Sequence, residues 1–405
     1  MAVIPVRRLL LNMAWPMMLS MLIQALYNLV DSMFVAQLSS DGFVALALVY
    51  PIQTLMIAVC VGTGVGFNAL LARRLGEDRP DEANRVVANG YFVYLVCWVV
   101  FLVLGVGLAP VFMELFAPGQ PQVIDYGIQY LSIVTGASVG ICMQFAGERT
   151  LQATGNTVGP MVIQGIGAVI NLILDPLLIF GIGPFPRMEV AGAALATVLG
   201  QVVGMVVGLC MVRRSSIVRL SFRGFRPDSA IIRTMFRVGV PAILVQALAT
   251  VMNLGMNLIL PLFTASGVFI LGAYFKLQSF LFMPVNGLNN ALIPIVSFNY
   301  GARQRSRITG VIHFALVLSA AIMAVGTVVF LAIPGPLLRL FDADAAVLAE
   351  GISALRLIAL SFVCAGVSVI LCAALQALGA ANSHPSGGGG GRPAGPAPAA
   401  GALRL

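Results

Sequence analysis

The stretch Pro16–Phe34, PMMLSMLIQALYNLVDSMF, has a weaker second copy at Pro241–Ile259, PAILVQALATVMNLGMNLI. The two copies are related by a spacing of 225 in the sequence (241 − 16), and Asn28 of the first falls on Asn253 of the second. Chance similarity between apolar helices is the alternative, but further landmarks in register favour an internal repeat. These landmarks are Gly76 with Gly301, Phe116 with Phe341, and LQATG at 151–155 with LQALG at 375–379.

The composition indicates a membrane protein. Of the 405 residues, 59% are hydrophobic and 9% are charged, whereas soluble proteins carry about 25% charged residues. Apolar runs near the roughly 20 residues needed to cross a bilayer recur along the chain. Because the first run is followed by many others, it is a span rather than a signal peptide. We predict ten helices, at about 11–38, 43–71, 88–110, 126–149, 157–181, 190–212, 236–263, 267–295, 308–333 and 351–378.

The basic residues indicate the orientation of the chain. The net charge of +8 comes from arginines in the connections between apolar runs, so nucleic acid is not an expected partner. Arginines crowd into alternate connections, which places those connections in the cytoplasm. We therefore predict a multi-pass protein of the cell membrane with a cytoplasmic N-terminus. The crowded connections hold Arg7 and Arg8; Arg73, Arg74, Arg79 and Arg85; Arg149; seven arginines from Arg213 to Arg237; and Arg303, Arg305 and Arg307.

The repeat also predicts the domain organisation. Six predicted spans separate the paired positions, and because six is even, both copies cross the membrane in the same direction. Parallel repeats form two lobes whose rocking gives alternating access. We predict an all-α polytopic membrane protein with two parallel-repeat helical lobes. The parts are an N-terminal lobe at 1–212, an arginine-rich linker at 213–235, a C-terminal lobe at 236–378 and a disordered tail at 379–405.

The two copies differ after their LQATG and LQALG landmarks. The first continues with two more apolar spans, whereas the second continues with a tract of Gly, Pro and Ala typical of a disordered linker. Lys276 is the only lysine among 23 basic residues, as expected of a GC-rich gene. We expect that a truncation or frameshift removed the last two helices; a functional tail is the alternative.

Two carboxylates lie inside predicted spans. An ionised Asp at the centre of a span, as Asp31 would be, costs roughly 2.5–3.5 kcal/mol on insertion scales; a helix end where it reaches water is the alternative. Asp175 follows Asn171 by four residues, so both face one side of a helix. A buried carboxyl group holds a proton readily, and carboxylate, amide and hydroxyl oxygens also suit Na⁺. We predict a cation-coupling site of Asp31, Asn171, Asp175 and Thr197, with Asp31, Asn171 and Asp175 as metal ligands if the ion is Na⁺.

Uncharged polar residues are scattered through the spans. They either join helices by hydrogen bonds worth about 0.6 kcal/mol each, or line a cavity for bulky amphipathic molecules. Lys276 can equally extend to the membrane surface, and Glu148 and Arg149 are expected to form a structural pair. For the substrate cavity we predict Gln24, Tyr27, Asn28, Gln53, Gln246, Asn253, Lys276 and Gln278.

Several motifs together resemble the multidrug and toxic compound extrusion (MATE) family of secondary transporters. The resemblance implies twelve helices in two six-helix lobes, of which about ten are present, and antiport with H⁺ or Na⁺. It also implies that Asp31, Asn171, Asp175 and Thr197 match the family's cation site. The motifs are WPMMLSMLIQALYNLVDSMFVAQL, ARRLGEDRPDEANRV, LQATGNT, GAVINLILDPLLIFG, VAGAALATVLGQ and MPVNGLNNALIPIVSFNYGA.

The function predicted from these features is export of hydrophobic organic cations, as a monomer and with no cofactor besides the coupling ion. An inactive truncated remnant is one alternative. A flippase for lipid-linked oligosaccharides is another, although it needs a cationic cavity and only Lys276 is available. A membrane-embedded enzyme is not expected, because no HExxH motif or His–Asp cluster lies at membrane depth.

Overall fold

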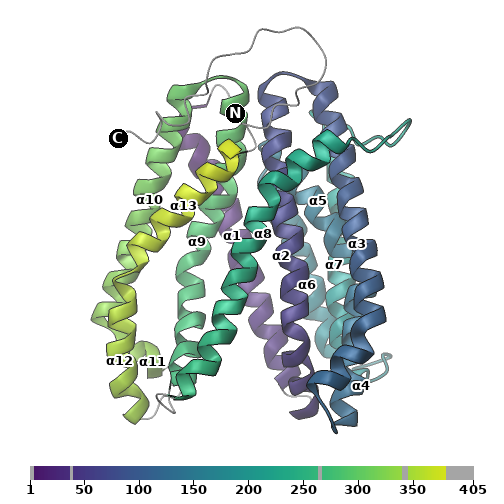
Figure 1. Ribbon diagram of the computed structural model, residues 1–405, viewed down its shortest axis with the longest axis vertical. Coiled ribbons are helices and arrows are strands. Elements are labelled where there is room, and N and C mark those ends of the chain that lie inside the picture. Colours follow the sequence, from purple (N-terminus) through teal and green to yellow (C-terminus); the bar gives the residue numbers. More distant parts are fainter. Residues whose placement is uncertain (1–3, 37–39, 263–266, 340–344, 380–405) are drawn as a thin grey trace.

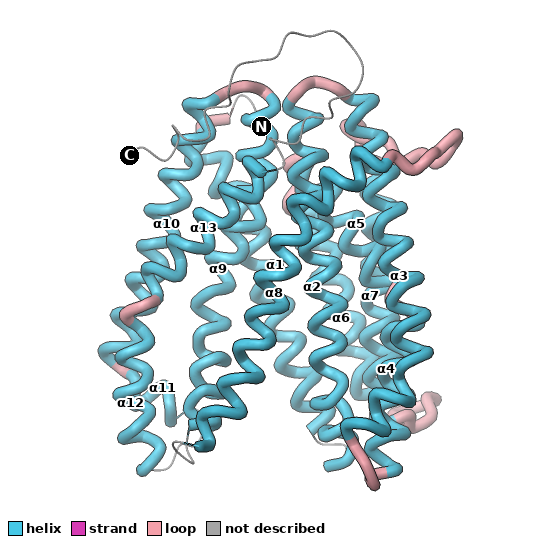
Figure 2. Tube along the Cα trace, viewed as in Figure 1, coloured by secondary structure: helices cyan, strands magenta, loops and turns pink. Residues whose placement is uncertain are grey.

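The regular structure of the described chain is helical, as Figures 1 and 2 show. The structure is a computed structural model that describes residues 4–36, 40–262, 267–339 and 345–379. Most of the predicted tail, 380–405, therefore lies outside the described residues. The same holds for the side chains of Tyr27, Asn28, Asp31 and Asn253, although their backbone is helical.

The described residues contain thirteen α-helices and one short 3₁₀-helix. In the first half they are α1 (Val6–Ala36), α2 (Ser40–Gly76), α3 (Pro80–Phe116), α4 (Pro121–Gly136), α5 (Val139–Ala153), α6 (Val158–Phe180) and α7 (Glu189–Arg213). In the second half they are α8 (Ser229–Ile259), η1 (Leu260–Leu262), α9 (Gly267–Gly301), α10 (Arg305–Ala332), α11 (Pro334–Arg339), α12 (Ala345–Ala359) and α13 (Phe362–Gly379).

The predicted spans correspond to these helices. Nine helices of the described chain are long and apolar enough to cross a membrane, and the α4–α5 pair, bent by 41°, makes a tenth. Helix ends differ from the prediction where a helix continues beyond the apolar region. α3 starts at Pro80 rather than at 88, because proline suits the first helical position and Asp81 and Glu82 suit the first turn.

The helix bounds repeat with the spacing of the sequence landmarks. Adding 225 to the bounds of α2 gives 265–301, and α9 spans Gly267–Gly301. The break between α4 and α5, at 137–138, recurs between α12 and α13, at 360–361. Figure 1 shows one group containing α2, α3, α5, α6 and α7 and another containing α9, α10, α12 and α13, with α1 and α8 between them. The two groups converge at the end that carries the N-terminus.

A pair of glycines brings α2 and α9 into backbone contact at this end. A Cβ atom on Gly76 would overlap the carbonyl oxygen of Phe298, and one on Gly301 would overlap the carbonyl oxygen of Arg73. The spacing of 225 relates the two glycines (301 − 76) and also their two partners (298 − 73). The contact is therefore made twice, once from each copy, as a two-fold axis between the copies requires.

A second pair of glycines follows the same rule. Gly62 of α2 lies against Ile243 of α8, and Gly287 of α9 lies against Met18 of α1. The same spacing of 225 again relates the glycines (287 − 62) and their partners (243 − 18). Each copy thus packs its first helix on the second helix of the other copy, and glycine allows the close approach.

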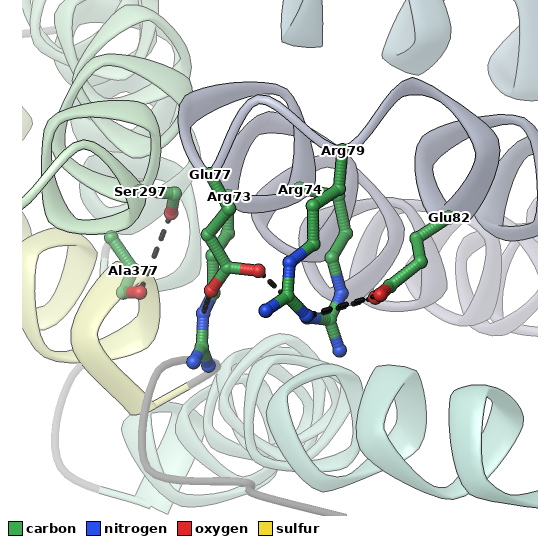
Figure 3. Close-up of polar contacts among 7 residues, drawn as sticks. All are labelled: Arg73, Arg74, Glu77, Arg79, Glu82, Ser297 and Ala377. Carbon is green, nitrogen blue, oxygen red and sulfur yellow. Dashed lines mark hydrogen bonds and ion pairs between the residues drawn. The ribbon is translucent and has the colours of Figure 1, made fainter. Parts of the chain in front are cut away.

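Ion pairs join residues on both sides of Gly76 (Figure 3). Glu77 accepts hydrogen bonds from Arg73 Nε at 2.8 Å and from Arg74 Nη1 at 2.7 Å. Arg74 also reaches Glu82 at 3.1 Å, across the turn to α3. On the neighbouring α9, Ser297 Oγ donates to the carbonyl oxygen of Ala377 on α13 at 3.3 Å. These contacts fasten the connections at the arginine-rich end of the helices.

Candidate functional site

Three of the four predicted cation-coupling residues meet between α6 and α7. Asn171 Nδ2 donates to Asp175 Oδ1 at 3.3 Å and lies 3.4 Å from Thr197 Oγ1. Asn171 is 4% exposed and Asp175 is fully buried. The two α6 residues share a face because they are one helical turn apart. Thr197 comes within reach because Gly167 and Gly200 let the two backbones approach closely.

The fourth predicted residue, Asp31, has a side chain outside the described residues, but its helix runs beside α6. Ser20 Oγ of α1 donates to Gln164 Oε1 of α6. Further along, the rings of Phe34 and Phe180 meet edge to face with centroids 6.3 Å apart. The helical segment that carries Asp31 therefore lies between two contacts with α6. Its role in coupling stays a prediction.

A small cavity with polar and apolar walls adjoins this group. Its volume is about 60 Å³, which is room for a few water molecules. This space is too small for a bulky drug and suits a small cation. Helices α1, α5, α6 and α7 line it, and the polar part of its lining consists of Gln24, Gln144, Glu148, Gln164, Asn171, Thr197 and Gln201.

The predicted pairing of Glu148 with Arg149 is wrong. Glu148 accepts hydrogen bonds from Gln144 Nε2 at 3.0 Å and Gln164 Nε2 at 3.1 Å. Arg149 Nη1 instead donates to Gln152 Oε1 at 2.9 Å and Asn290 Oδ1 at 3.2 Å. Adjacent residues on a helix do not face each other. The spacing of four between Gln144 and Glu148 was the sequence signal for this partner.

The other residues predicted for the substrate cavity are spread over three helices. Gln53 of α2 and Gln278 of α9 are half-buried, whereas Gln246 of α8 and Lys276 of α9 are exposed. None of these four residues lines the small cavity. Gln24, which was also predicted for the substrate cavity, does line it. No group of three or more His, Cys, Asp or Glu residues suited to a metal ion occurs within the described ranges. The part of the predicted cavity residues in substrate binding stays a prediction.

Comparison with known proteins identifies the family. A family model described as MatE matches residues 16–177 and 241–383, and the starts of these two stretches differ by 225 (241 − 16). The chain is 29% identical over 308 residues to a FAD transporter from Shewanella oneidensis, covering 75% of this chain and 67% of that protein. It is 24% identical over 372 residues to the multidrug export protein MepA from Staphylococcus haemolyticus, covering 91% and 81%.

The fold has been seen before in solved structures. A MOP superfamily transporter from Pyrococcus furiosus superposes with a TM-score of 0.84 at 23% identity, covering 93% of this chain and 84% of that one. At this identity the likeness shows the fold alone. The family match extends over most of the chain, in both copies of the repeat. The chain therefore belongs to the MatE family of multidrug efflux transporters, which are multi-pass proteins of the cell membrane.

Proposed function

We propose that this protein exports hydrophobic organic cations by antiport with H⁺ or Na⁺. The observation that supports this most directly is the buried group of Asn171, Asp175 and Thr197. A carboxyl group enclosed in this way is stable when it carries a proton or holds a cation, and unstable when it carries neither. Exchange of that cation is thus a means of coupling an ion gradient to a change of shape.

The driving force is sufficient for useful export. One cation moving through about 100 mV releases about 2.3 kcal/mol, and each 1.4 kcal/mol is worth about tenfold in a concentration ratio. One ion per substrate therefore supports a gradient of roughly fifty-fold. The negative potential of buried carboxylates also favours cationic substrates over anionic ones.

The lobe contacts support an alternating-access cycle. The glycine contacts at Gly76 and Gly301 lie at the C-terminal ends of α2 and α9, where the arginine-rich connections with Arg79 and Arg303 begin. If this end faces the cytoplasm, as the arginine distribution predicts, the structure is closed toward the cytoplasm. Rocking of the lobes would separate these glycines and open a path from the inside.

The test is ethidium efflux from a drug-sensitive bacterial strain that expresses the protein. We expect the wild type to expel ethidium, and we expect this efflux to stop when the H⁺ and Na⁺ gradients are dissipated. Asp175→Asn should lower the efflux rate by more than about tenfold, because a neutral amide cannot exchange a cation. Asp125→Asn is the matched control, because Asp125 is exposed on α4, and it should behave as the wild type.

Two results would contradict the proposal. Unchanged efflux in Asp175→Asn would remove Asp175 from the coupling site. Absence of efflux from a wild-type protein that is folded in the membrane would favour an inactive remnant.

A flavin dinucleotide is the second candidate substrate, because one relative is named a FAD transporter. The phosphates of such a molecule are anionic, so the buried carboxylates Glu148 and Asp175 would repel them. Measurement of flavin in the culture medium of the same strains separates the two substrates. Release of flavin without efflux of ethidium would show that the substrate is a flavin dinucleotide and not an organic cation.

A further inference from the structure

A second buried acid lies in the N-terminal lobe, apart from the Asn171–Asp175–Thr197 group. Glu148 on α5 is 2% exposed, and each of its carboxylate oxygens accepts one hydrogen bond from a glutamine amide. Gln144 donates from the same helix and Gln164 donates from α6. Two amide donors orient the carboxyl group, but they do not neutralise a negative charge.

No basic side chain forms an ion pair with Glu148 within the described part of the chain. Arg149 is the nearest basic residue in sequence, and its guanidinium is directed to Gln152 and to Asn290 on α9. Tyr94 of α3 is the next ionisable residue to consider. Its hydroxyl group lies beside Arg149, because both the hydroxyl group and Arg149 Nε lie next to Gly64. From α6, the ionisable group on this side of the lobe is Asp175, which is itself acidic.

The cavity offers further cation ligands beside Glu148. Asn171 Oδ1 and Gln201 Oε1 are buried and have no hydrogen-bond partner among the described residues. Both residues line the cavity with Glu148, and Asn171 is 4% exposed. Two amide oxygens without donors, together with the carboxylate of Glu148, around a cavity of about 60 Å³ form an environment that attracts a small hard cation. A proton carried by the carboxyl group or by a water molecule fits the same space.

We propose that Glu148 is the carboxylate of a second cation site, which binds an exchangeable H⁺ or Na⁺ and shares its cavity with Asn171. Asn171 also donates to Asp175, so one amide side chain lines the cavity beside Glu148 and contacts the other acid. This inference rests on the proposed function for its purpose, since a second site would let the lobe exchange two cations or pass one between acids. The binding itself does not depend on any exported substrate.

Infrared difference spectroscopy tests the site on the full-length protein, purified into lipid nanodiscs. The carbonyl stretch of a neutral carboxyl group reports protonation directly. We expect this signal to fall when the pH is raised, and Glu148→Gln should remove the contribution of one carboxyl group. Asp175→Asn should remove a different contribution, and the exposed Glu114→Gln on α3 should leave the spectrum unchanged.

Addition of NaCl at fixed pH separates the two cations. A fall of the Glu148 signal with NaCl assigns Na⁺ as a competing ligand, whereas a response to pH alone assigns the proton. Identical spectra for wild type and Glu148→Gln would overturn the proposal. If Glu148→Gln does not fold, Glu148→Asp decides, because a carboxyl group shorter by one methylene should change the pH midpoint of its signal, and an unchanged midpoint would also overturn the proposal.

Transport measurements keep this inference distinct from the proposed function. We expect Glu148→Gln to lower gradient-driven ethidium efflux by about tenfold, since it removes one exchangeable cation. Cation exchange at Glu148 in a protein that does not move ethidium would refute the export proposal alone. Full efflux in Asp175→Asn, together with a Glu148 signal that responds to cations, would place the coupling at Glu148.

Discussion

Helix α5 of the first copy and α13 of the second occupy corresponding places, and their polar residues differ. Glu148 of α5 corresponds to Cys372 of α13, at the spacing of 224 that aligns LQATG with LQALG. Arg149 corresponds to Ala373 at the same spacing. In the first span, Asp31 corresponds to Met256 at the spacing of 225. Asp31 and Glu148 of the first copy thus have no acidic counterpart at the matching positions of the second.

The scaffold, by contrast, is shared between the copies. The helix bounds, the break between α4 and α5, and both glycine contacts recur at nearly the same spacing. What the copies share is the geometry by which they pack on each other, and what they do not share is the polar chemistry. A symmetric interface suits rocking between two states, while cation exchange on one side alone would couple that motion to an ion gradient.

The largest expected effect comes from the shared interface. Gly76→Ala and Gly301→Ala each place a Cβ atom on a backbone carbonyl oxygen of the opposite copy. A backbone cannot move aside as a side chain does, and overpacking costs about 1–3 kcal/mol. We expect each substitution to lower ethidium efflux by about tenfold or more, because the contact between the two copies no longer closes.

Gly272→Ala on α9 is the control for this pair, since a Cβ atom there would contact nothing within 4 Å. Its efflux should equal that of the wild type. Two-fold symmetry requires similar effects at Gly76 and Gly301. A large effect at one position and none at the other would show that the interface is symmetric in shape only.

The helical scaffold could be predicted from the sequence because its signals are local. Apolar length and the alternation of arginines define the spans, and the spacing of four between Asn171 and Asp175 places them on one face. Of the two partners of Glu148, Gln144 is signalled by its spacing of four, but Gln164 could not be predicted because it lies on another helix, where only packing brings it near. The small cavity was missed for the same reason, since four helices line it.

A smaller effect is expected at a helix cap of the second copy. Asp228 precedes α8 and accepts hydrogen bonds from the backbone N–H groups of Ala230 at 2.9 Å and Ile231 at 3.3 Å. The corresponding residue of the first copy, at the spacing of 225, is the apolar Val3. Asp228→Ala should lower the free energy of unfolding by about 1 kcal/mol.

Denaturant unfolding of the purified protein, followed by circular dichroism, measures this difference. Asp228→Ser should retain most of the stability, because a hydroxyl oxygen caps a helix nearly as well as a carboxylate. Equal stability of the alanine variant and the wild type would mean that α8 is held by its packing against α2 and not by its cap.

The smallest effect is expected at Glu77, which also distinguishes the copies because Ala302 stands at the matching position of the second. Burial raises the pKa of Glu77, but the hydrogen bond from Arg74 and the charge and hydrogen bond of Arg73 outweigh burial and lower it below the ordinary value of 4.5. A lowered pKa means that the folded state favours the ionised form. The stabilisation is therefore complete above about pH 5 and is lost as the pH falls through the folded-state pKa.

Glu77→Gln should consequently lower the free energy of unfolding by up to about 1 kcal/mol at neutral pH, since the ion pairs are partly exposed to solvent. The difference between wild type and variant should shrink toward zero as the pH falls below the folded-state pKa, because Glu77 becomes neutral in the wild type as well. Glu114→Gln, on an exposed position of α3, should show no difference at any pH. A difference at Glu77 that stays constant with pH would assign the effect to the packing of its side chain, and the first copy would then differ from the second at this turn in shape and not in charge.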